Sequence, residues 1–333
     1  MKYDIFFHND FDGRASAAVM LAFLQSRGDD IANYVPIKYD IIPEWVDERY
    51  FEKRMVPRRS AAVRGRSSAA PHPAIIVDFP YHPASAFWFD HHLKPFRRDG
   101  WEARFKPDRE HRYDDTYRSA CHLVYDSLRQ GFGWKPPVHM RELVRWLDVV
   151  DGADYRSARQ TIELKEPALL ANAAIEFELN NHAAAEWTVR YLADHSLEQY
   201  VSSSRIRPVL ARVRRAIASG VAFYRGHIVI DGRVMIADLS PDPAADIAHF
   251  APYYIHPDML YVVRYHPFYG KPNLFHINVG CNPWRRSENK KHIGELMKRF
   301  GGGGHRTVGG AEIEGRTNTL RAVADMVDYL NRK

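Results

Sequence analysis

The stretch Tyr3-Asp-Ile-Phe-Phe-His8-Asn-Asp10-Phe-Asp12-Gly13-Arg-Ala-Ser-Ala-Ala18 begins as a short apolar run and ends in small residues. The apolar run is typical of a buried strand, and the small residues after Gly13 favour a helix. His8, Asp10 and Asp12 lie between the two, and burying such groups without partners costs several kcal/mol each. A bound cation would remove this cost. The alternative is an ordinary turn in which Asp12 caps the following helix.

Two further segments repeat this form. Residues 73–78 read Pro-Ala-Ile-Ile-Val-Asp, and residues 86–92 read Ala-Phe-Trp-Phe-Asp-His-His. Apolar strands without polar alternation are typical of a parallel sheet covered on both faces, where ligands collect at the carboxyl ends of the strands. We therefore expect an α/β domain in which the acidic ends of three strands converge. A further strand is expected at residues 33–39.

Three segments of this part of the chain have helical periodicity. Residues 14–27 form an amphipathic pattern with a small-residue face, and Ser119 is a suitable N-cap for a helix over 119–130. A helix over 138–150 carries Asp148 and places it on one face with Asp151. Asp148 is unexpected in an apolar helix unless it is paired, whereas Asp151 before Gly152 is also an ordinary helix end.

Beyond an all-helical region at 166–220, the pattern changes to short strands of a smaller α+β domain. Strands are expected at 227–230, 233–238, 260–265 and 274–279, with Asp231-Gly232 as a hairpin turn, and helices at 290–300 and 319–331. Between these helices lies Gly301-Gly-Gly-Gly-His305-Arg306. A glycine run is commonly a flexible linker, but backbone N–H groups beside His and Arg favour a nest that binds an anion.

Length and composition indicate a folded protein of two domains. The chain has 333 residues, of which 45% are hydrophobic, and no apolar run approaches the roughly 20 residues of a membrane span. The N-terminal residues lack the pattern of a secretory signal, so the expected location is cytoplasmic. Cys121 and Cys281 lie far apart without a nearby second cysteine, which argues against a disulfide framework and against a cysteine zinc site.

The net charge of +6 favours an anionic partner. Much of it is concentrated in one segment that is also rich in Ser, Ala and Pro. A solvated surface loop is one interpretation of this segment, and contact with a phosphate backbone is the other. Its six basic residues are Lys53, Arg54, Arg58, Arg59, Arg64 and Arg66.

On these motifs, the sequence resembles the DHH phosphoesterases over nearly its whole length. The triplet that gives the family its name is Asp90-His91-His92, and the last third resembles the DHH-associated domain through Gly302-Gly303-Gly304-His305. The other family motifs correspond to residues 8–13, Asp78, and Asp151 with Asp148 as its competitor. The resemblance implies a DHH catalytic domain at 1–195, a helical linker at 196–225 and a substrate-binding domain at 226–333.

The resemblance also implies two divalent cations, usually manganese, in the first domain. One ion would be held by His8, Asp10 and Asp78, and the other by Asp12, Asp78, His91 and Asp151. Carboxylates suit a hard ion and imidazoles favour manganese over magnesium, with iron, cobalt and zinc left open. His92 would face the phosphate as a catalytic residue, and Asp90 would orient His91.

The function implied is hydrolysis of a phosphoester by a water that two metal ions activate. The predicted substrate is a short nucleotide: nanoRNA, a linear dinucleotide or a cyclic dinucleotide. The residues expected to bind its remote part are Gly302, Gly303, Gly304, His305 and Arg306.

Three other functions stay open. They are a phosphatase acting on polyphosphate or a nucleoside bisphosphate, a RecJ-like exonuclease on single-stranded nucleic acid with Trp284 as a stacking residue, and a non-catalytic binding protein that kept the fold. The strand arginine that this family often has ahead of the glycines lacks a direct counterpart, and Arg264, Arg285 and Arg286 are the candidates to replace it. RNA against DNA, and a homodimer against a monomer, are left open.

Overall fold

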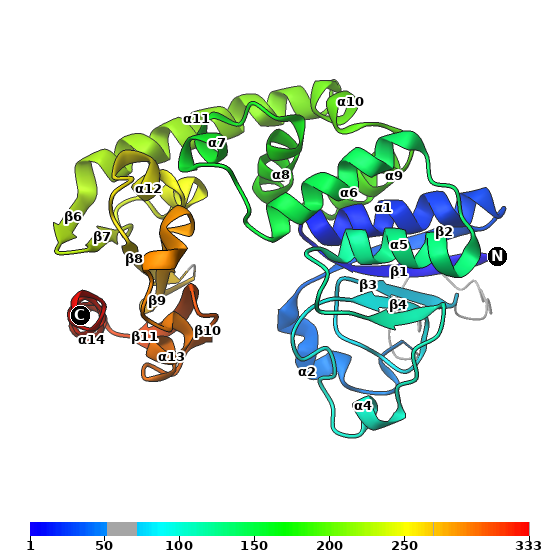
Figure 1. Cartoon of the computed structure of the whole chain (residues 1–333), viewed down its shortest axis with the longest axis horizontal. Helices are drawn as coiled ribbons and strands as arrows, with labels where there is room; N and C mark the ends of the chain where they lie inside the picture. The colour runs from blue at the N-terminus through cyan, green and yellow to red at the C-terminus, as the bar shows by residue number, and fades with distance from the viewer. Residues whose placement is uncertain (52–71, 269, 333) are drawn as a thin grey trace, which may run out of the picture. The chain divides into compact units, whose positions relative to one another are not determined.

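The computed structural model describes residues 1–51, 72–268 and 270–332, and the chain forms two compact units. The first comprises Met1–Asp154 and Glu166–Val209, and the second comprises Tyr155–Lys165 and Leu210–Lys333. The predicted fold class is confirmed, because an α/β unit with a parallel sheet is joined to a second unit with a mixed sheet (Figure 1). The predicted basic segment Lys53–Arg66 lies outside the described residues.

The first unit is built on five parallel strands in the order β2-β1-β3-β4-β5. Phe7 of β1 pairs with Val77 of β3, and Val77 pairs with Phe89 of β4. The predicted convergence of strand ends follows from this register. The strands are β1 Lys2–His8, β2 Asp30–Ile37, β3 Ala74–Val77, β4 Ser85–Asp90 and β5 His111–Tyr113.

Helices cover both faces of this sheet (Figure 1). One face carries an aromatic core in which Phe6, Trp45 and Trp88 are fully or almost fully buried. On the other face, α1 is buried on nearly all sides, so the prediction of an amphipathic helix there is wrong. The reason is that α1 packs on the sheet and also against α5, α6 and α9. The helices are α1 Phe11–Ser26, η1 Tyr39–Ile41, α2 Ile42–Trp45, α4 Trp101–Arg104, α5 Ala120–Phe132, α6 Val138–Asp151, α8 Pro167–Phe177, α9 His182–Asp194 and α10 Leu197–Ser202.

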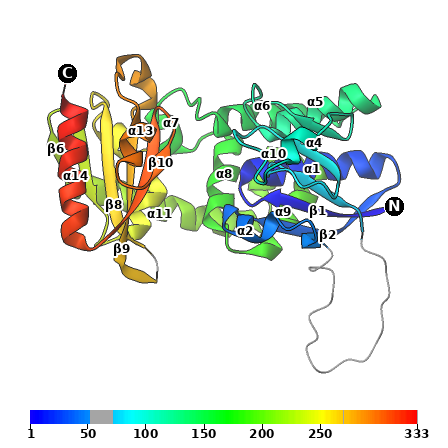
Figure 2. The ribbon, with the colours of Figure 1, turned by 90° about the horizontal axis from the view of Figure 1, so that it is seen from below.

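The second unit has a six-stranded sheet in the order β10-β11-β9-β8-β7-β6, in which only β7 and β8 are parallel. Helix α14 lies along one face of this sheet (Figure 2), where Ile277, Met297 and Met326 are fully buried. The hairpin predicted at Asp231-Gly232 is confirmed. The elements are α7 Ala158–Glu163, α11 Ile206–His227, β6 Ile228–Asp231, β7 Val234–Asp238, η2 Pro243–Ala248, α12 Ala251–Ile255, β8 Tyr261–Phe268, β9 Lys271–Cys281, η3 Pro283–Glu288, α13 Ile293–Lys298, β10 Gly303–Gly304, β11 Val308–Glu314 and α14 Arg316–Asn331.

Two expectations from composition can be compared with the described residues. Cys121 and Cys281 are both buried free thiols. Among the described residues, no helix combines the length and the apolar character that a bilayer crossing requires.

Candidate metal centre

The carboxyl ends of three neighbouring strands place three polar side chains in one row. Because Phe7, Val77 and Phe89 are paired in register, the residues that follow them, His8, Asp78 and Asp90, come at the same edge of the sheet. This edge is where ligands bind in open parallel sheets. The repeated strand-then-Asp pattern of the sequence therefore has a spatial counterpart.

The loop from β1 to α1 fixes His8 and Asp10. Asp10, and not Asp12, is the N-cap of α1, and its Oδ1 accepts a hydrogen bond from Gly13 N at 2.9 Å. Its other oxygen, Oδ2, lies 2.8 Å from His8 Nδ1. A side chain at Gly13 would collide with the carbonyl oxygen of His8, so only glycine allows α1 to begin this close to the strand.

Asp12 is fixed by a helix that is far away in sequence. Its two carboxylate oxygens accept hydrogen bonds from the N–H groups of Ala120 at 2.6 Å and Cys121 at 2.9 Å, in the first turn of α5. Ser119 is the N-cap of that helix, as predicted, and its side chain accepts from His122 N. Unpaired N–H groups and the helix dipole stabilise a carboxylate at a helix N-terminus. Asp12 is therefore held rigidly, with 3% of its surface exposed.

The Nε2 atom of His91 lies among three carboxylates. This atom is 3.5 Å from Asp151 Oδ2, 3.7 Å from Asp12 Oδ2 and 3.8 Å from Asp78 Oδ1. Nδ1 is 3.1 Å from the carbonyl oxygen of Tyr117, which can only accept, so Nδ1 carries the proton. In the neutral ring, the lone pair on Nε2 then points toward the carboxylates, as it does in a histidine that binds a metal ion.

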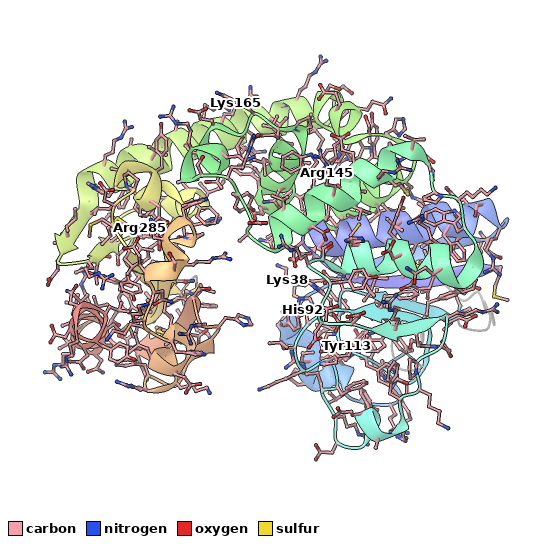
Figure 3. All side chains as sticks on the ribbon, viewed as in Figure 1. Lys38, His92, Tyr113, Arg145, Lys165 and Arg285 are labelled. Carbon is pink, nitrogen blue, oxygen red and sulfur yellow. The ribbon has the colours of Figure 1, made fainter. Side chains whose placement is uncertain are left out.

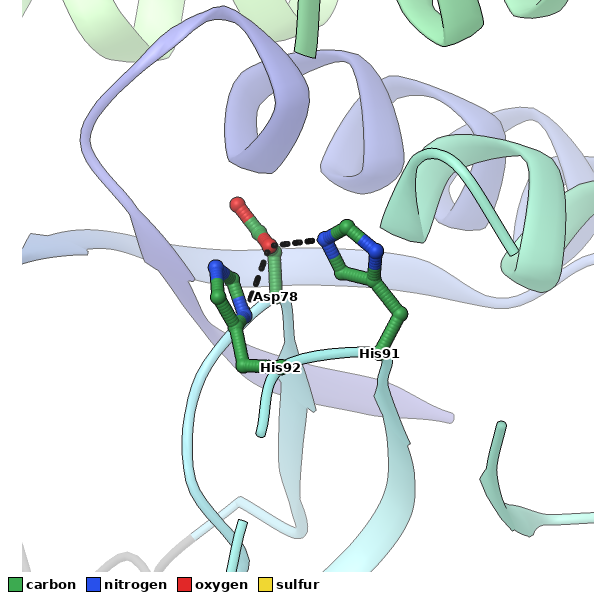
Figure 4. A group of neighbouring side chains, drawn as sticks. All are labelled: Asp78, His91 and His92. Carbon is green, nitrogen blue, oxygen red and sulfur yellow. Dashed lines mark ion pairs between the residues drawn. The ribbon is translucent and has the colours of Figure 1, made fainter. Parts of the chain in front are cut away.

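Asp78 is the centre of the group. Its side chain is 1% exposed, and neither carboxylate oxygen has a hydrogen-bond partner among the described residues. Its backbone is left-handed, with φ at 57°, a conformation that is uncommon for residues other than glycine and that clusters at functional sites. Figure 4 shows the Asp78 carboxylate between the rings of His91 and His92.

The carboxylates destabilise one another in the absence of a cation. Burial and the charges of Asp151 and Asp10 raise the pKa of Asp12 well above its ordinary value. Burial and the charges of Asp12 and Asp10 raise the pKa of Asp78 in the same way. Asp10 differs: burial opposes its ionisation, but the hydrogen bond with His8 lowers its pKa to about 2. A positive ion at this position would offset the repulsion and stabilise all the carboxylates in their charged form.

The donor set fits divalent cations. Three overlapping groups of side chains have ligand atoms within 4.8 Å of one another, and Asp78 belongs to two of these groups. Both carboxylate oxygens of Asp78 and Nε2 of His91 are buried and without hydrogen bonds among the described residues, so they are suitable ligands for such an ion. The groups are His8, Asp10 and Asp78; Asp12, His91 and Asp151; and Asp78, His91 and His92.

Asp90 orients His92 and not His91, so the predicted pairing is wrong. Asp90 Oδ1 lies 2.8 Å from His92 Nδ1 and also accepts from His92 N. Asp90 is fully buried at the end of β4, and the chain turns there so that the ring two residues later folds back over its carboxylate. His91, between them, points toward Asp78 instead.

The fold is similar to that of several solved structures. A pGpG-specific phosphodiesterase, PggH, from Vibrio cholerae matches with a TM-score of 0.70 at 16% identity, and the match covers 99% of both chains. The DHH domain of a member of the s1p family of ribosomal proteins matches with a TM-score of 0.54 at 14% identity, over 99% of this chain and 87% of that chain. The chain has the DHH fold.

A third similar structure is that of RecJ from Thermus thermophilus, solved in complex with Mn²⁺. It matches with a TM-score of 0.57 at 13% identity, over 100% of this chain and 52% of the RecJ chain. No protein-family model and no curated protein matches the sequence. At these identities, the comparisons confirm the predicted resemblance at the level of the fold.

The two candidates for the fourth DHH motif lie in different surroundings. Asp151, at the end of α6, faces His91 across 3.5 Å and belongs to the metal-ligand groups. Asp148 accepts from Ser119 Oγ at 2.8 Å and pairs with His122 Nδ1 at 2.8 Å. Asp148 therefore has the polar partners that we expected for an aspartate in an apolar helix, and Asp151 is the candidate ligand.

Replacing Asp151 by Asn should weaken Mn²⁺ binding by at least ~100-fold, because it removes one carboxylate charge from the cluster. Asp148→Asn is the matched control on the same helix. It keeps an oxygen that can accept from Ser119 and should change the affinity by less than ~10-fold. Isothermal titration of the metal-free variants with Mn²⁺ measures both. Equal losses in the two variants would contradict the assignment.

The glycine run of the second unit lies in close contact with the backbone of β11. Gly303 and Gly304 form β10 and pair with β11, and a side chain at Gly302 would collide with the carbonyl oxygen of Gly310. The N–H groups of Gly302 and His305 already donate to the carbonyls of Met297 and Val308. The run is therefore not the fully open nest that the sequence suggested, although the side chains of His305 and Arg306 are exposed.

Of the three arginines that are candidates to replace the strand arginine of the family, two form ion pairs within the second unit. Arg264 on β8 pairs with Asp246, and Arg285 lies 2.6 Å from Glu288. Arg286 has no ion-pair partner within 4.0 Å among the described residues. Arg286 therefore stays the candidate whose charge is free for a ligand.

Sequence reasoning missed Tyr39. Its ring lies 5.1 Å from that of His8 and 6.0 Å from that of His92, and its buried hydroxyl has no hydrogen-bond partner among the described residues. Burial and the charges of Asp78 and Asp90 raise the pKa of Tyr39, so the hydroxyl keeps its proton. A tyrosine after a strand is common, and nothing in the local pattern marks this one.

Proposed function

We propose that the chain is a divalent-metal-dependent phosphodiesterase that hydrolyses short oligonucleotides or dinucleotides. The observation that carries this proposal is Asp78, a buried carboxylate without hydrogen bonds that lies between two sets of carboxylate and imidazole donors. A protein that uses the fold only for binding has no need for such a costly arrangement. In this proposal, residues 1–195 are catalytic, 196–225 form a helical linker and 226–333 bind the substrate.

The proposed ligands are His8, Asp10 and Asp78 for one ion and Asp12, Asp78, His91 and Asp151 for the other. Two ions held there would polarise a phosphoryl oxygen and supply hydroxide near neutral pH. The mixture of carboxylates and imidazoles favours manganese as the metal. Structures of RecJ with Mn²⁺ and with Mg²⁺ support a divalent ion on this fold.

His92 is proposed as the catalytic residue that contacts the phosphate. Burial disfavours its charged form, but the hydrogen bond to Asp90 outweighs this and raises the pKa of His92. A proton held on Nδ1 by Asp90 leaves Nε2–H free to donate to a phosphoryl oxygen. Asp90 acts as the positioning residue, because it fixes both the ring and its charge.

The substrate assignment has two supports. PggH from Vibrio cholerae, which matches over 99% of both chains, is a pGpG-specific phosphodiesterase, and this favours a dinucleotide. In the second unit, the exposed side chains of His305 and Arg306 beside β10 are suitable for a phosphate or a base. Gly302, Gly303 and Gly304 would allow close approach of the backbone, and Gly303 has open space at its Cβ position.

Product analysis with manganese tests the proposal. The substrates are a linear dinucleotide, a cyclic dinucleotide, a long single strand and polyphosphate, and the products are separated by chromatography. We expect mononucleotides from the dinucleotides, faster than from the long strand. Free phosphate from polyphosphate would favour a phosphatase, and faster cleavage of the long strand a RecJ-like exonuclease. The latter is less favoured because the indole of Trp284 donates to Tyr155 O and packs on Phe250.

A further inference from the structure

A pocket lies in the first unit, between α5, α6 and the turn that joins them. Its volume is about 650 Å³, which is within the range of small-molecule sites. The pocket shares no residue with the candidate metal ligands. Its basic side chains come from both helices and the turn: Arg129, Lys135, Arg141 and Arg145.

These positive charges exceed the negative charges that could neutralise them. Lys135, Arg141 and Arg145 have no ion-pair partner among the described residues. The two acidic residues of the pocket are already engaged. Asp148 pairs with Ser119 and His122, and Asp126 accepts from Tyr117 at 3.2 Å and lies 3.4 Å from Arg129. The pocket therefore presents uncompensated positive charge.

The aromatic side chains that line the pocket are buried and packed against each other. Trp134 is 8% exposed and Tyr125 is 7% exposed, and their rings pack edge to face at 6.3 Å. The Arg129 guanidinium lies 5.3 Å from the centre of the Tyr125 ring, which holds this cation in place. Pro136 and Pro137 restrict the turn. A preformed site of this kind loses little conformational entropy when a ligand binds.

Arg141 and Arg145 are one turn apart on the same side of α6, as residues four apart on a helix are. Figure 3 labels Arg145 on this helix. Two neighbouring guanidinium groups repel each other, and an anion with several oxygens relieves that repulsion. A guanidinium group donates two parallel hydrogen bonds to a carboxylate or a phosphate, and only an anion with several charged oxygens can satisfy both arginines, which favours a polyphosphate over a halide or a single carboxylate.

We propose that this pocket binds a small anion with two or more phosphate groups, either inorganic pyrophosphate or the diphosphate of a nucleotide. Lys135, Arg141 and Arg145 supply the phosphate contacts, and the volume leaves room for a nucleoside. This site is separate from the one proposed for catalysis and does not depend on that function. Asp148, in the pocket wall, lies one turn before Asp151, so the two sites share helix α6.

Isothermal titration of the full chain tests this proposal, with pyrophosphate and ADP as separate ligands and a chelator present to exclude divalent ions. We expect one binding event that Arg141→Ala/Arg145→Ala weakens by at least ~10-fold. Lys2→Ala/Lys106→Ala is the matched control, because it removes the same charge from exposed positions outside the pocket. It should leave the affinity within ~2-fold of that of the unaltered chain.

Two further titrations test where the anion binds and whether the nucleoside contributes to binding. Asp78→Asn should leave binding unchanged, whereas a loss there would place the anion at the metal centre and overturn the proposal. Equal affinities for pyrophosphate and ADP would show recognition of phosphate alone, and tighter ADP binding would show a contact with the nucleoside. The absence of binding, or equal weakening by the arginine and lysine pairs, would also overturn it. Thermal unfolding checks that the variants are folded.

Discussion

Asp78→Asn is expected to lower kcat/KM for the phosphoester substrate by on the order of 10³-fold or more. In the proposed centre Asp78 is a ligand of both ions, and two of the three donor groups include it. Metal ions supply several kcal/mol of transition-state stabilisation, and each ~1.4 kcal/mol is a factor of ten in rate. The amide of Asn keeps the size of the side chain but removes the charge that would bridge two cations. Steady-state kinetics in saturating Mn²⁺ measures the effect.

A second measurement separates this result from simple unfolding. Asp78 is buried without a hydrogen bond beside other carboxylates, so its removal should stabilise the metal-free protein. We therefore expect an inactive variant whose melting temperature in chelator is equal to or higher than that of the unaltered chain. Activity within tenfold of the unaltered chain would contradict the bridging role. A variant that melts much lower in chelator would contradict the account of charge repulsion.

The sequence was informative where strand geometry alone decides position. In a parallel sheet, the residues after three paired strands must come at one edge, so the apolar runs before His8, Asp78 and Asp90 were sufficient to predict the convergence. Gly13 was also informative, because a helix that begins immediately after a strand needs a residue without a side chain there. These are local consequences of register and steric fit.

The sequence was uninformative where the partner is distant or belongs to the backbone. Asp12 is held by N–H groups of α5, more than a hundred residues later, and His91 is oriented by the carbonyl of Tyr117. A backbone partner leaves no trace in side-chain patterns. The choice between Asp148 and Asp151 has the same origin, since it depends on where His122 and His91 lie after packing.

Similarly, the role of the glycine run could not be read from composition. Both an anion nest and a tight strand pair require residues without side chains, and only the pairing of β10 with β11 distinguishes them. The N–H of Gly302 is already used as well, in a hydrogen bond to the carbonyl of Met297 in α13. Most substrate contacts there are therefore expected from the exposed side chains of His305 and Arg306, with Gly303 as the glycine that has open space beside it.

Removal of divalent ions is expected to destabilise the protein, and more strongly as the pH rises. In the folded chain without metal, the pKa values of Asp12 and Asp78 are raised above those of the unfolded chain. The folded state then binds more protons than the unfolded state, so stability falls as the pH rises above about 4. Adding Mn²⁺ to ~100 times its dissociation constant should restore about 2.7 kcal/mol. Differential scanning calorimetry with chelator or Mn²⁺ at several pH values measures both effects.

The comparison with Asp78→Asn isolates the carboxylate from the other titrating groups of the chain. Below pH ~4, where the carboxylate is protonated in both states, the two proteins should have similar stability in chelator. As the pH rises, the unaltered chain should lose stability relative to the variant, because it has the raised pKa of Asp78 in addition to that of Asp12. Mn²⁺ should reverse this order, since only the unaltered chain has the shared donor. A difference between the two proteins that stays constant with pH, or a melting temperature that does not respond to Mn²⁺, would show that these carboxylates do not form a metal centre.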